Sequence, residues 1–336
     1  MTIKENQSLR PFNTFGLEAS CLGLIRIYSV EDLLDVIQNN IHPLRILGGG
    51  SNILLSGDIP AYSLKNEIKG LTIIEEDENQ VLVEVGAGEP WHQFVMWSIA
   101  HGFAGIENLA LIPGTVGAAP MQNIGAYGVE QEMAFAKLKA THLTTGTESV
   151  FTKTDCAFGY RESVFKNELK DQYFITHVSY RLLKKDYSLH LQYGDIQKTL
   201  TNMSVANPGL EDVAAAVIEI RRSKLPDPKK IGNAGSFFKN PVVDATKYDE
   251  LKLLYPEIPG YPTTENNIKL PAGWLIEKAG YKGYRSGSIG VHQLQALVLV
   301  NYGGGHGKDI QNLAYEIQEK VWEIFGVRIS PEVNFW

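Results

Sequence analysis

Apolar residues recur with the period of an α-helix in four stretches of the chain, at residues 29–37, 91–102, 210–224 and 310–325. The first begins at Ser29-Val-Glu-Asp, which is a capping sequence, and the second ends at Gly102. The third ends at the pair Pro226 and Pro228, since proline cannot continue a helix. We therefore predict four amphipathic helices, with a domain boundary near the proline pair.

Shorter apolar or alternating runs predict strands at residues 22–28, 44–47, 71–75, 81–85, 137–143, 173–183 and 296–300. The first two flank the first helix, so they predict a βαβ unit. The strands at 137–143 and 173–183 predict part of a mixed sheet, with Phe158-Gly-Tyr-Arg161 in the connection between them. After the proline pair, a short helix opened by Pro271 precedes the strand at 296–300, so that this part is predicted to be α+β.

A glycine triplet, Gly48-Gly49-Gly50-Ser51-Asn52, directly follows the predicted strand 44–47. Bare backbone N–H groups after a buried strand can hold a phosphate or a diphosphate. The spacing is not that of a dinucleotide fingerprint, because Ile53 stands where the third glycine would be. On spacing alone, a phosphate cradle and a tight structural turn both stay open.

The segment Ile112–Gly128, which reads IPGTVGAAPMQNIGAYG, has no regular period. Its glycines and prolines make a poor helix and a poor strand, yet it is too apolar for a solvated loop. It is predicted to lie against a large, flat, partly apolar ligand; a buried irregular connection is the alternative.

Ser236 stands between glycines and two phenylalanines in the segment Gly232–Pro241, which reads GNAGSFFKNP. Small residues let the backbone approach closely, and the aromatic pair can exclude water. This setting predicts a water-poor turn in which the hydroxyl of Ser236 acts as an acid; an ordinary turn or helix cap is the alternative.

Composition narrows the class of protein. The 336 residues include 44% hydrophobic ones, enough for a core in each of about two domains. A formal net charge of -7 with interspersed signs argues against nucleic acid as the main partner. Cys21 and Cys156 lie far apart and are predicted to be buried small residues. With neither a signal sequence nor a membrane span in view, we expect a protein of the cytoplasm. We also expect it to be a monomer.

Five ordered motifs give the chain a resemblance to a known family. They are GGGSN at Gly48–Asn52, the segment Ile112–Gly128, FGYRES at Phe158–Ser163, GNAGSFFKNP at Gly232–Pro241 and PEV at Pro331–Val333. In this order and at these separations they resemble the UDP-N-acetylenolpyruvoylglucosamine reductases, over nearly the whole chain. The tyrosine loop Gln192-Tyr193-Gly194-Asp195 resembles that of the type I subgroup.

The resemblance implies an α+β fold with a two-lobed FAD-binding region of the vanillyl-alcohol-oxidase type and a smaller substrate domain. The implied division is 1–66 and 67–224 for the two lobes and 225–327 for the substrate domain, with 328–336 returning near the first lobe. The implied cofactor is FAD, with NADPH as hydride donor and no metal. Its cofactor-binding residues would be Gly48, Gly49, Gly50, Ser51, Asn52, Pro113, Gly114, Thr115, Gly117, Gln122, Asn123, Gly125, Ala126 and Tyr127.

The family reaction implies roles for three catalytic residues, Arg161, Ser236 and Glu332. Hydride would reach C3 of an enolpyruvyl ether on UDP-N-acetylglucosamine, giving UDP-N-acetylmuramate for peptidoglycan synthesis. Arg161 would hold the charge that develops on the carboxylate, and Ser236 would protonate C2. Glu332 would orient the enol or share the proton donation, although Ser330 and Asn334 depart from the family pattern beside it. Substrate-facing positions would be Tyr193, Lys224, Asn240, Tyr261, Lys269 and Gln295.

Two alternatives stay open at this point. One is another flavin-dependent oxidoreductase of the same fold, which acts on an alcohol or a sugar with oxygen as acceptor; no His or Cys at a convincing flavin-attachment position favours it. The other is a catalytically silent module that binds nucleotide sugars. Arg161, Ser236 and Glu332 together argue against a pure binding module, which has no use for a proton donor.

Overall fold

The computed structural model describes residues 2–263 and 266–336, and their contacts divide them into two compact units. Unit 1 comprises residues 2–7, Cys21–Gly50 and Pro60–Ser223. Unit 2 comprises Ser8–Ser20, Ser51–Ile59 and Lys224–Trp336. The chain therefore passes from one unit to the other between Gly50 and Ser51, inside the predicted glycine turn. The three-part division given above stays a prediction.

The first sheet of unit 1 has the strand order β1-β2-β5-β3. Its strands are β1 (Ile3–Ser8), β2 (Ser20–Ile27), β5 (Ile59–Asn66) and β3 (Leu44–Leu47). Helix α1 (Val30–Gln38) starts at Ser29, whose hydroxyl forms the predicted capping box with Asp32, and it buries Leu33 and Val36 against the sheet. The predicted βαβ unit is modified, because β5 lies between β2 and β3 and pairs in parallel with β3.

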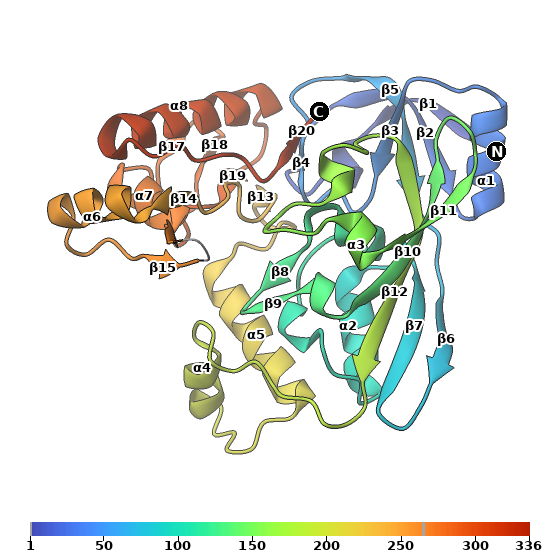
Figure 1. The fold of residues 1–336 in the computed structure, drawn as a ribbon. Helices are drawn as coiled ribbons and strands as arrows, with labels where there is room; N and C mark the ends of the chain where they lie inside the picture. Colours follow the sequence, from blue (N-terminus) through green and yellow to red (C-terminus); the bar gives the residue numbers. More distant parts are fainter. Residues whose placement is uncertain (1, 264–265) are drawn as a thin grey trace. The chain divides into compact units, whose positions relative to one another are not determined.

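The second sheet of unit 1 has the strand order β11-β10-β12-β7-β6. Its strands are β11 (Glu148–Thr152), β10 (Phe135–His142), β12 (Tyr173–Leu183), β7 (Gln80–Gly86) and β6 (Leu71–Glu76). The prediction of a mixed sheet is wrong here: every neighbouring pair is antiparallel. Helix α2 (Trp91–Ala100) lies against one face (Figure 1), with Trp91 and Phe94 in contact with Tyr180 of β12.

The remainder of unit 1 is mostly short elements. Residues 112–128 are largely irregular, as predicted, with single 3-10 turns η3 (Val116–Ala118) and η4 (Pro120–Gln122) before the small hairpin of β8 (Gly125–Ala126) and β9 (Val129–Glu130). The other elements are η2 (Glu107–Leu109), η5 (Gln131–Met133), α3 (Lys153–Cys156), η6 (Val164–Lys166), α4 (Ile196–Asn202) and α5 (Leu210–Lys224). Cys21 and Cys156 are buried as predicted, and burial raises the pKa of the Cys156 thiol to about 12.

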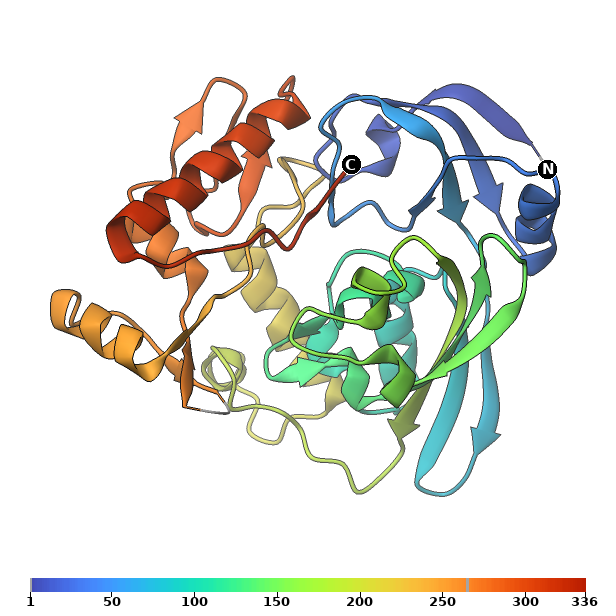
Figure 2. The same ribbon diagram turned by 45° about the horizontal axis from the view of Figure 1, so that its top comes forward.

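Unit 2 combines small sheets with helices. Its strands are β13 (Gly232–Asn233), β19 (Leu299–Asn301), β18 (Ile289–Val291) and β17 (Arg285–Ser286) in one sheet, β14 (Val242–Asp244), β16 (Asn267–Lys269) and β15 (Tyr261–Pro262) in another, and β4 (Ile53–Leu54) with β20 (Asn334–Phe335) as a parallel pair. Its helices are η1 (Arg10–Phe12), α6 (Ala245–Leu254), α7 (Ala272–Lys278) and α8 (Gly307–Phe325). Figure 2 shows α8 running along the sheet that contains β18 and β19.

One strand of unit 2 is displaced from its prediction. The sequence predicts a strand at 296–300, but β19 begins at Leu299. Before it, the N–H of Val298 donates to the carbonyl of Gln295, so residues 295–298 form a turn. The apolar run is buried as predicted, yet part of it lies in a turn. Among the residues that the structure describes, no helix is both long and apolar enough to cross a lipid bilayer.

Candidate active site

The glycine turn after β3 is held against the irregular segment of unit 1. A Cβ on Gly49 would lie 2.7 Å from the Cα of Gly114, and one on Gly48 would lie 3.0 Å from Thr115 Oγ1. Gly50 has a φ of +64°, in the region that favours glycine. Two segments that the sequence assigned separately to the cofactor therefore meet, and their contact allows no side chain at Gly49.

A second glycine turn, Gly86-Ala87-Gly88 at the end of β7, supports the same segment. The N–H of Gly117 donates to the carbonyl of Ala87 at 2.8 Å, and a Cβ on Gly117 would lie 2.6 Å from that of Ala87. On either side, Gly86 and Gly88 lie against the backbone of Ile68 and its neighbours. The signal in the sequence was the Gly-Ala-Gly spacing, which did not reveal its long-range partner.

Asn123 is fully buried and organises the end of the irregular segment. Its side-chain amide donates to Glu130 Oε2 at 2.9 Å and to the carbonyl of Gly159 at 3.2 Å. Its own φ of +43° is left-handed, which non-glycine residues seldom adopt. The predicted cofactor residue Asn123 thus ties the segment to the connection that carries Arg161.

Arg161 lies against the same segment. Its Nη2 donates to the carbonyl of Gly125 at 2.7 Å, and its Nη1 lies 3.5 Å from the carbonyl oxygen of Asn123. Arg161 also has a left-handed backbone, with a φ of +59°. Residues in such conformations cluster at functional sites because the surrounding structure must hold them there. The structure therefore brings the predicted catalytic arginine together with two predicted cofactor residues.

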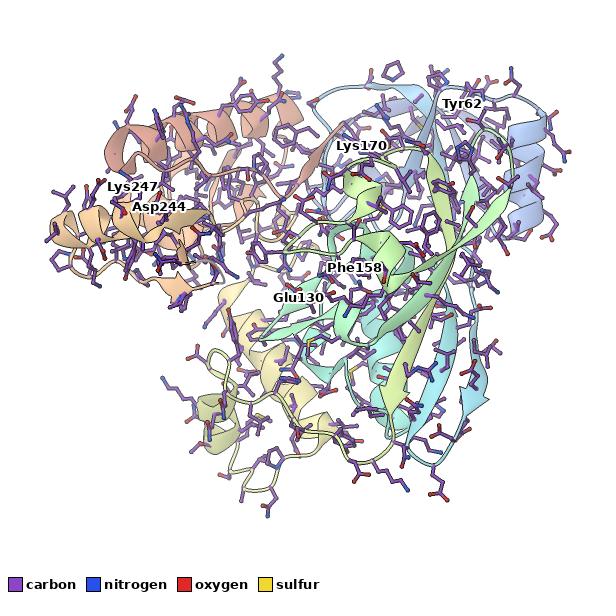
Figure 3. The ribbon with its side chains drawn as sticks, in the orientation of Figure 1. Tyr62, Glu130, Phe158, Lys170, Asp244 and Lys247 are labelled. Carbon is purple, nitrogen blue, oxygen red and sulfur yellow. The ribbon has the colours of Figure 1, made fainter. Side chains whose placement is uncertain are left out.

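Glu130, which sequence reasoning missed, is the charged group beside this arginine. It pairs with Gly125 in the β8–β9 hairpin and is labelled in Figure 3. Burial raises the pKa of Glu130, the positive charge of Arg161 opposes that change, and the negative charge of Glu132 adds to it. Nothing in the local sequence distinguishes Glu130 from other surface acids; only the fold places it next to Arg161.

Tyr127 and Tyr193 are neighbours in unit 1. A Cβ on Gly128 would lie 3.3 Å from Tyr193 Cβ, and one on Gly194 would lie 3.5 Å from the ring of Tyr127. Tyr193 keeps 60% of its surface exposed. Burial lowers the pKa of Arg221 of α5, and the neighbouring Tyr127 side chain opposes that change. The predicted substrate tyrosine thus sits on a predicted cofactor residue.

Ser236 stands at the tip of a turn in unit 2. Asn233 holds the turn, since its side-chain oxygen accepts from the N–H of Gly235 at 2.9 Å, and Gly235 has a φ of +71°. Phe237 and Phe238 are buried in the core of unit 2, but Ser236 is exposed. The predicted water-poor turn is therefore only half right, because the two rings turn inward and leave the serine outside.

Glu332 lies on the segment that pairs with this turn. Its N–H donates to the carbonyl of Phe237 at 2.8 Å, and Phe238 and Pro331 form an antiparallel bridge. Asn52 joins them from the other side, as its side-chain amide donates to the carbonyl of Glu332 at 3.2 Å. Three segments from distant parts of the sequence, which carry the predicted residues Asn52, Ser236 and Glu332, thus meet in unit 2.

The predicted substrate-facing residues of unit 2 fall into separate places. Tyr261 and Lys269 are cross-strand partners on β15 and β16, and Tyr261 is 57% exposed. Asn240 accepts from the N–H of Ala272 at 2.9 Å and so fixes the start of α7. Gln295 accepts from the N–H of Leu297 at 3.3 Å. Lys224 is exposed at the end of α5.

Comparison with known proteins first defines a class. Residues 26–152 match the family model described as "FAD binding domain", and residues 227–336 match the C-terminal domain of UDP-N-acetylenolpyruvoylglucosamine reductase. The chain is therefore an FAD-binding oxidoreductase, and the predicted cofactor is confirmed.

Relatives along the whole chain define the family. The UDP-N-acetylenolpyruvoylglucosamine reductase of Flavobacterium johnsoniae is 49% identical and covers 99% of this chain and 99% of the relative. That of Pseudomonas aeruginosa is 47% identical, covering 100% and 99%. The crystal structure of the reductase from Thermus caldophilus, at 23% identity, has the same fold, with a TM-score of 0.69 over 100% of this chain and 99% of that one.

The chain belongs to the UDP-N-acetylenolpyruvoylglucosamine reductase family, and the predicted α+β fold is confirmed.

Proposed function

We propose that this protein reduces the enolpyruvyl group of UDP-N-acetylglucosamine enolpyruvate, giving UDP-N-acetylmuramate for peptidoglycan synthesis. The observation that carries the proposal is the pairing of the Ser236 turn with Glu332, in a chain that matches its relatives from end to end. Bound FAD would supply the hydride chemistry between NADPH and C3 of the substrate. The protein's own residues hold the cofactor, stabilise the charge that develops and deliver the proton.

The glycine turn and the irregular segment are proposed to hold FAD. Gly48–Asn52 would take the diphosphate, because a bare backbone turn at the carboxyl end of a strand presents N–H groups to an anion. Thr115 and Tyr127 would line the flavin with the other predicted cofactor residues, and the fully buried Asn123 would hold the segment in shape. Close backbone contacts at Gly49 and Gly117, where a Cβ would not fit, support this role.

Arg161 is proposed to hold the carboxylate of the enolpyruvyl group. Hydride addition to C3 moves negative charge toward that carboxylate, and a guanidinium grips it with two parallel hydrogen bonds. The carbonyls of Gly125 and Asn123 fix the position of the guanidinium before substrate arrives. The guanidinium of Arg161 would thus already be oriented when the substrate binds.

Ser236 is proposed to give its proton to C2. Its exposed hydroxyl stands on a rigid base of buried phenylalanines, so that the turn need not rearrange to present it. A serine is a weak acid, and Glu332, Lys224 and Asn240 would assist it once the substrate excludes water.

The nucleotide end of the substrate is proposed to bind to unit 2. Lys269 and Tyr261, which are adjacent across two strands, suit a diphosphate and a ring respectively. Gln295 would add a polar contact to this end of the substrate. Tyr193 of unit 1 is proposed as a further substrate residue, because its side chain is 60% exposed. We also propose that the enzyme is a monomer in the cytoplasm, where NADPH is the common reductant.

The test is an NADPH oxidation assay with the enolpyruvyl substrate, run with and without oxygen. The proposal expects a yellow protein that oxidises NADPH only when this substrate is present, at the same rate in both atmospheres. Oxygen uptake driven by an alcohol or a sugar would instead identify the other oxidoreductase. A protein that takes up FAD but never oxidises NADPH would be a silent binding module.

A further inference from the structure

Lys65 stands at the edge of the first sheet of unit 1 where the glycine turn begins. It is the penultimate residue of β5, three positions after Tyr62, which Figure 3 labels. In the parallel pairing of β5 with β3, Lys65 is opposite Leu47, the last residue of β3. In sheets with parallel strands, ligands bind beyond the carboxyl ends of the strands. Lys65 lies at the carboxyl end of β5.

The ammonium of Lys65 contacts the glycine turn directly. Its Nζ donates to the carbonyl oxygen of Gly48 at 2.7 Å, and the side chain is partly buried. A carbonyl is a neutral partner, and an ammonium can donate three hydrogen bonds. Within residues 2–263 and 266–336, no carboxylate forms an ion pair with Lys65. The Lys65 ammonium therefore faces the turn with a neutral hydrogen-bond partner, the Gly48 carbonyl.

The charges around Lys65 do not neutralise it. Glu67, the acid closest along the strand, is paired with Arg26 at 2.5 Å. Lys69 donates to the carbonyl of Gly88 at 2.6 Å and pairs with Glu89 at 3.5 Å. Burial lowers the pKa of Lys65, the charge of Glu67 opposes this, and Lys69 and Arg26 lower it further. Arg26 and Lys69 thus each have a carboxylate partner, whereas Lys65 has none in the part of the chain that the structure describes. A bound anion would therefore stabilise this group of charges.

We propose that Lys65 binds the diphosphate of FAD directly, as a cationic partner to the backbone N–H groups of the glycine turn. The ammonium is anchored to the first glycine, so that it lies next to any anion held by the second and third. A fixed charge at this distance forms a charge-assisted hydrogen bond to a phosphate oxygen. The inference rests on FAD as cofactor and is independent of which substrate the flavin reduces.

The test is a titration of the flavin-free protein with FAD, without substrate or NADPH, at several salt concentrations. The variants are Lys65→Met and Lys65→Arg. The matched control is Lys69→Met, which removes a lysine that also donates to a glycine carbonyl but has its own carboxylate. We expect Lys65→Met to weaken FAD binding about 10- to 100-fold. The FAD affinity of this variant should also depend less on salt concentration than that of the wild type. Lys65→Arg should restore most of the affinity, and Lys69→Met should change it less than threefold.

Three results would overturn the proposal. One is wild-type FAD affinity in Lys65→Met. Another is a loss of affinity with unchanged salt dependence and a lower melting temperature of the flavin-free protein, which would mean that Lys65 only supports the Gly48 carbonyl. The third is an equal loss in Lys69→Met. If Lys65→Met fails to fold, Lys65→Arg and Lys65→Gln decide instead: the proposal requires the arginine to bind FAD at least tenfold more tightly than the glutamine.

Discussion

The glycine turn of unit 1 and the serine turn of unit 2 are built by opposite means. At Gly48–Gly50 the backbone itself is proposed to bind the diphosphate, and Gly49 lies so close to Gly114 that no Cβ fits between them. At Ser236 the backbone only positions a side chain. Phe237 and Phe238 anchor the turn in the core, and the Ser236 hydroxyl is exposed. A cofactor that stays bound suits the first design, and a proton that must be transferred suits the second.

This contrast predicts different consequences of mutation in the two turns. A side chain added to the glycine turn should disturb folding and FAD binding together, because the backbone contact itself is lost. A side chain removed at Ser236 should leave both intact and affect chemistry alone. Ser236→Ala and Gly49→Ala test the two sides of this contrast, and Arg161→Lys and Glu130→Gln test the charged pair of unit 1.

The largest effect is expected for Ser236→Ala. Loss of a general acid costs about 10²- to 10⁴-fold in rate, so that substrate-dependent NADPH oxidation should fall by that factor. FAD content and melting temperature should stay at wild-type values, because the side chain is exposed. Ser286→Ala, at an exposed strand position, is the control. A variant that turns over normally would remove Ser236 from the mechanism.

The second-largest effect is expected for Arg161→Lys, a loss of about 10²- to 10³-fold in kcat. A lysine retains the charge but cannot reproduce the fork or reach both the Gly125 and Asn123 carbonyls. Steady-state kinetics separate kcat from KM, and Arg181→Lys on the surface of β12 is the control. A change confined to KM would show that Arg161 only binds substrate.

Gly49→Ala should destabilise the protein by about 1–3 kcal/mol, because the new methyl group would meet the Gly114 backbone at 2.7 Å. FAD affinity should fall in the same variant. Thermal unfolding and FAD titration measure the two effects, and Gly57→Ala, which has nothing within 4 Å of the added Cβ, is the control. Equal behaviour of the two alanine variants would refute the close-packed turn.

Glu130→Gln should give the smallest effect, which depends on pH. Because burial raises the folded-state pKa of Glu130, the unfolded chain loses this proton first as pH rises. Wild-type stability should therefore fall between the ordinary glutamate pKa and the raised one, and the glutamine variant should not share that fall. Melting curves across this pH range test it; parallel curves for the two proteins would contradict the raised pKa.

Local patterns predicted much of this fold. Ser29 and Asp32 form the predicted capping box, and the phenylalanine pair beside Ser236 is buried as expected. Both features can be read from neighbouring residues. A capping box joins residues three positions apart, and the burial of two adjacent phenylalanines follows from their hydrophobicity.

Long-range pairing is what the sequence did not reveal. The insertion of β5 between β2 and β3 depends on strands that are adjacent in space only, and the contact of Gly49 with Gly114 joins residues 65 positions apart (114 − 49 = 65). The same holds for the charged groups of the site: Lys65 and Glu130 occur in ordinary polar stretches. Only the register of β5 against β3, and the β8–β9 hairpin, place them beside the glycine turn and Arg161.

The most direct test of the central claim separates the two half-reactions of Ser236→Ala by rapid mixing without oxygen. NADPH should reduce its bound flavin at the wild-type rate, since the glycine turn that is proposed to hold the cofactor is unchanged. Subsequent addition of the enolpyruvyl substrate should restore the oxidised flavin spectrum about 10²- to 10⁴-fold more slowly than in the wild type. Reoxidation at the wild-type rate, or slower reduction by NADPH, would contradict the claim that the glycine turn holds the cofactor and that Ser236 acts only on the substrate.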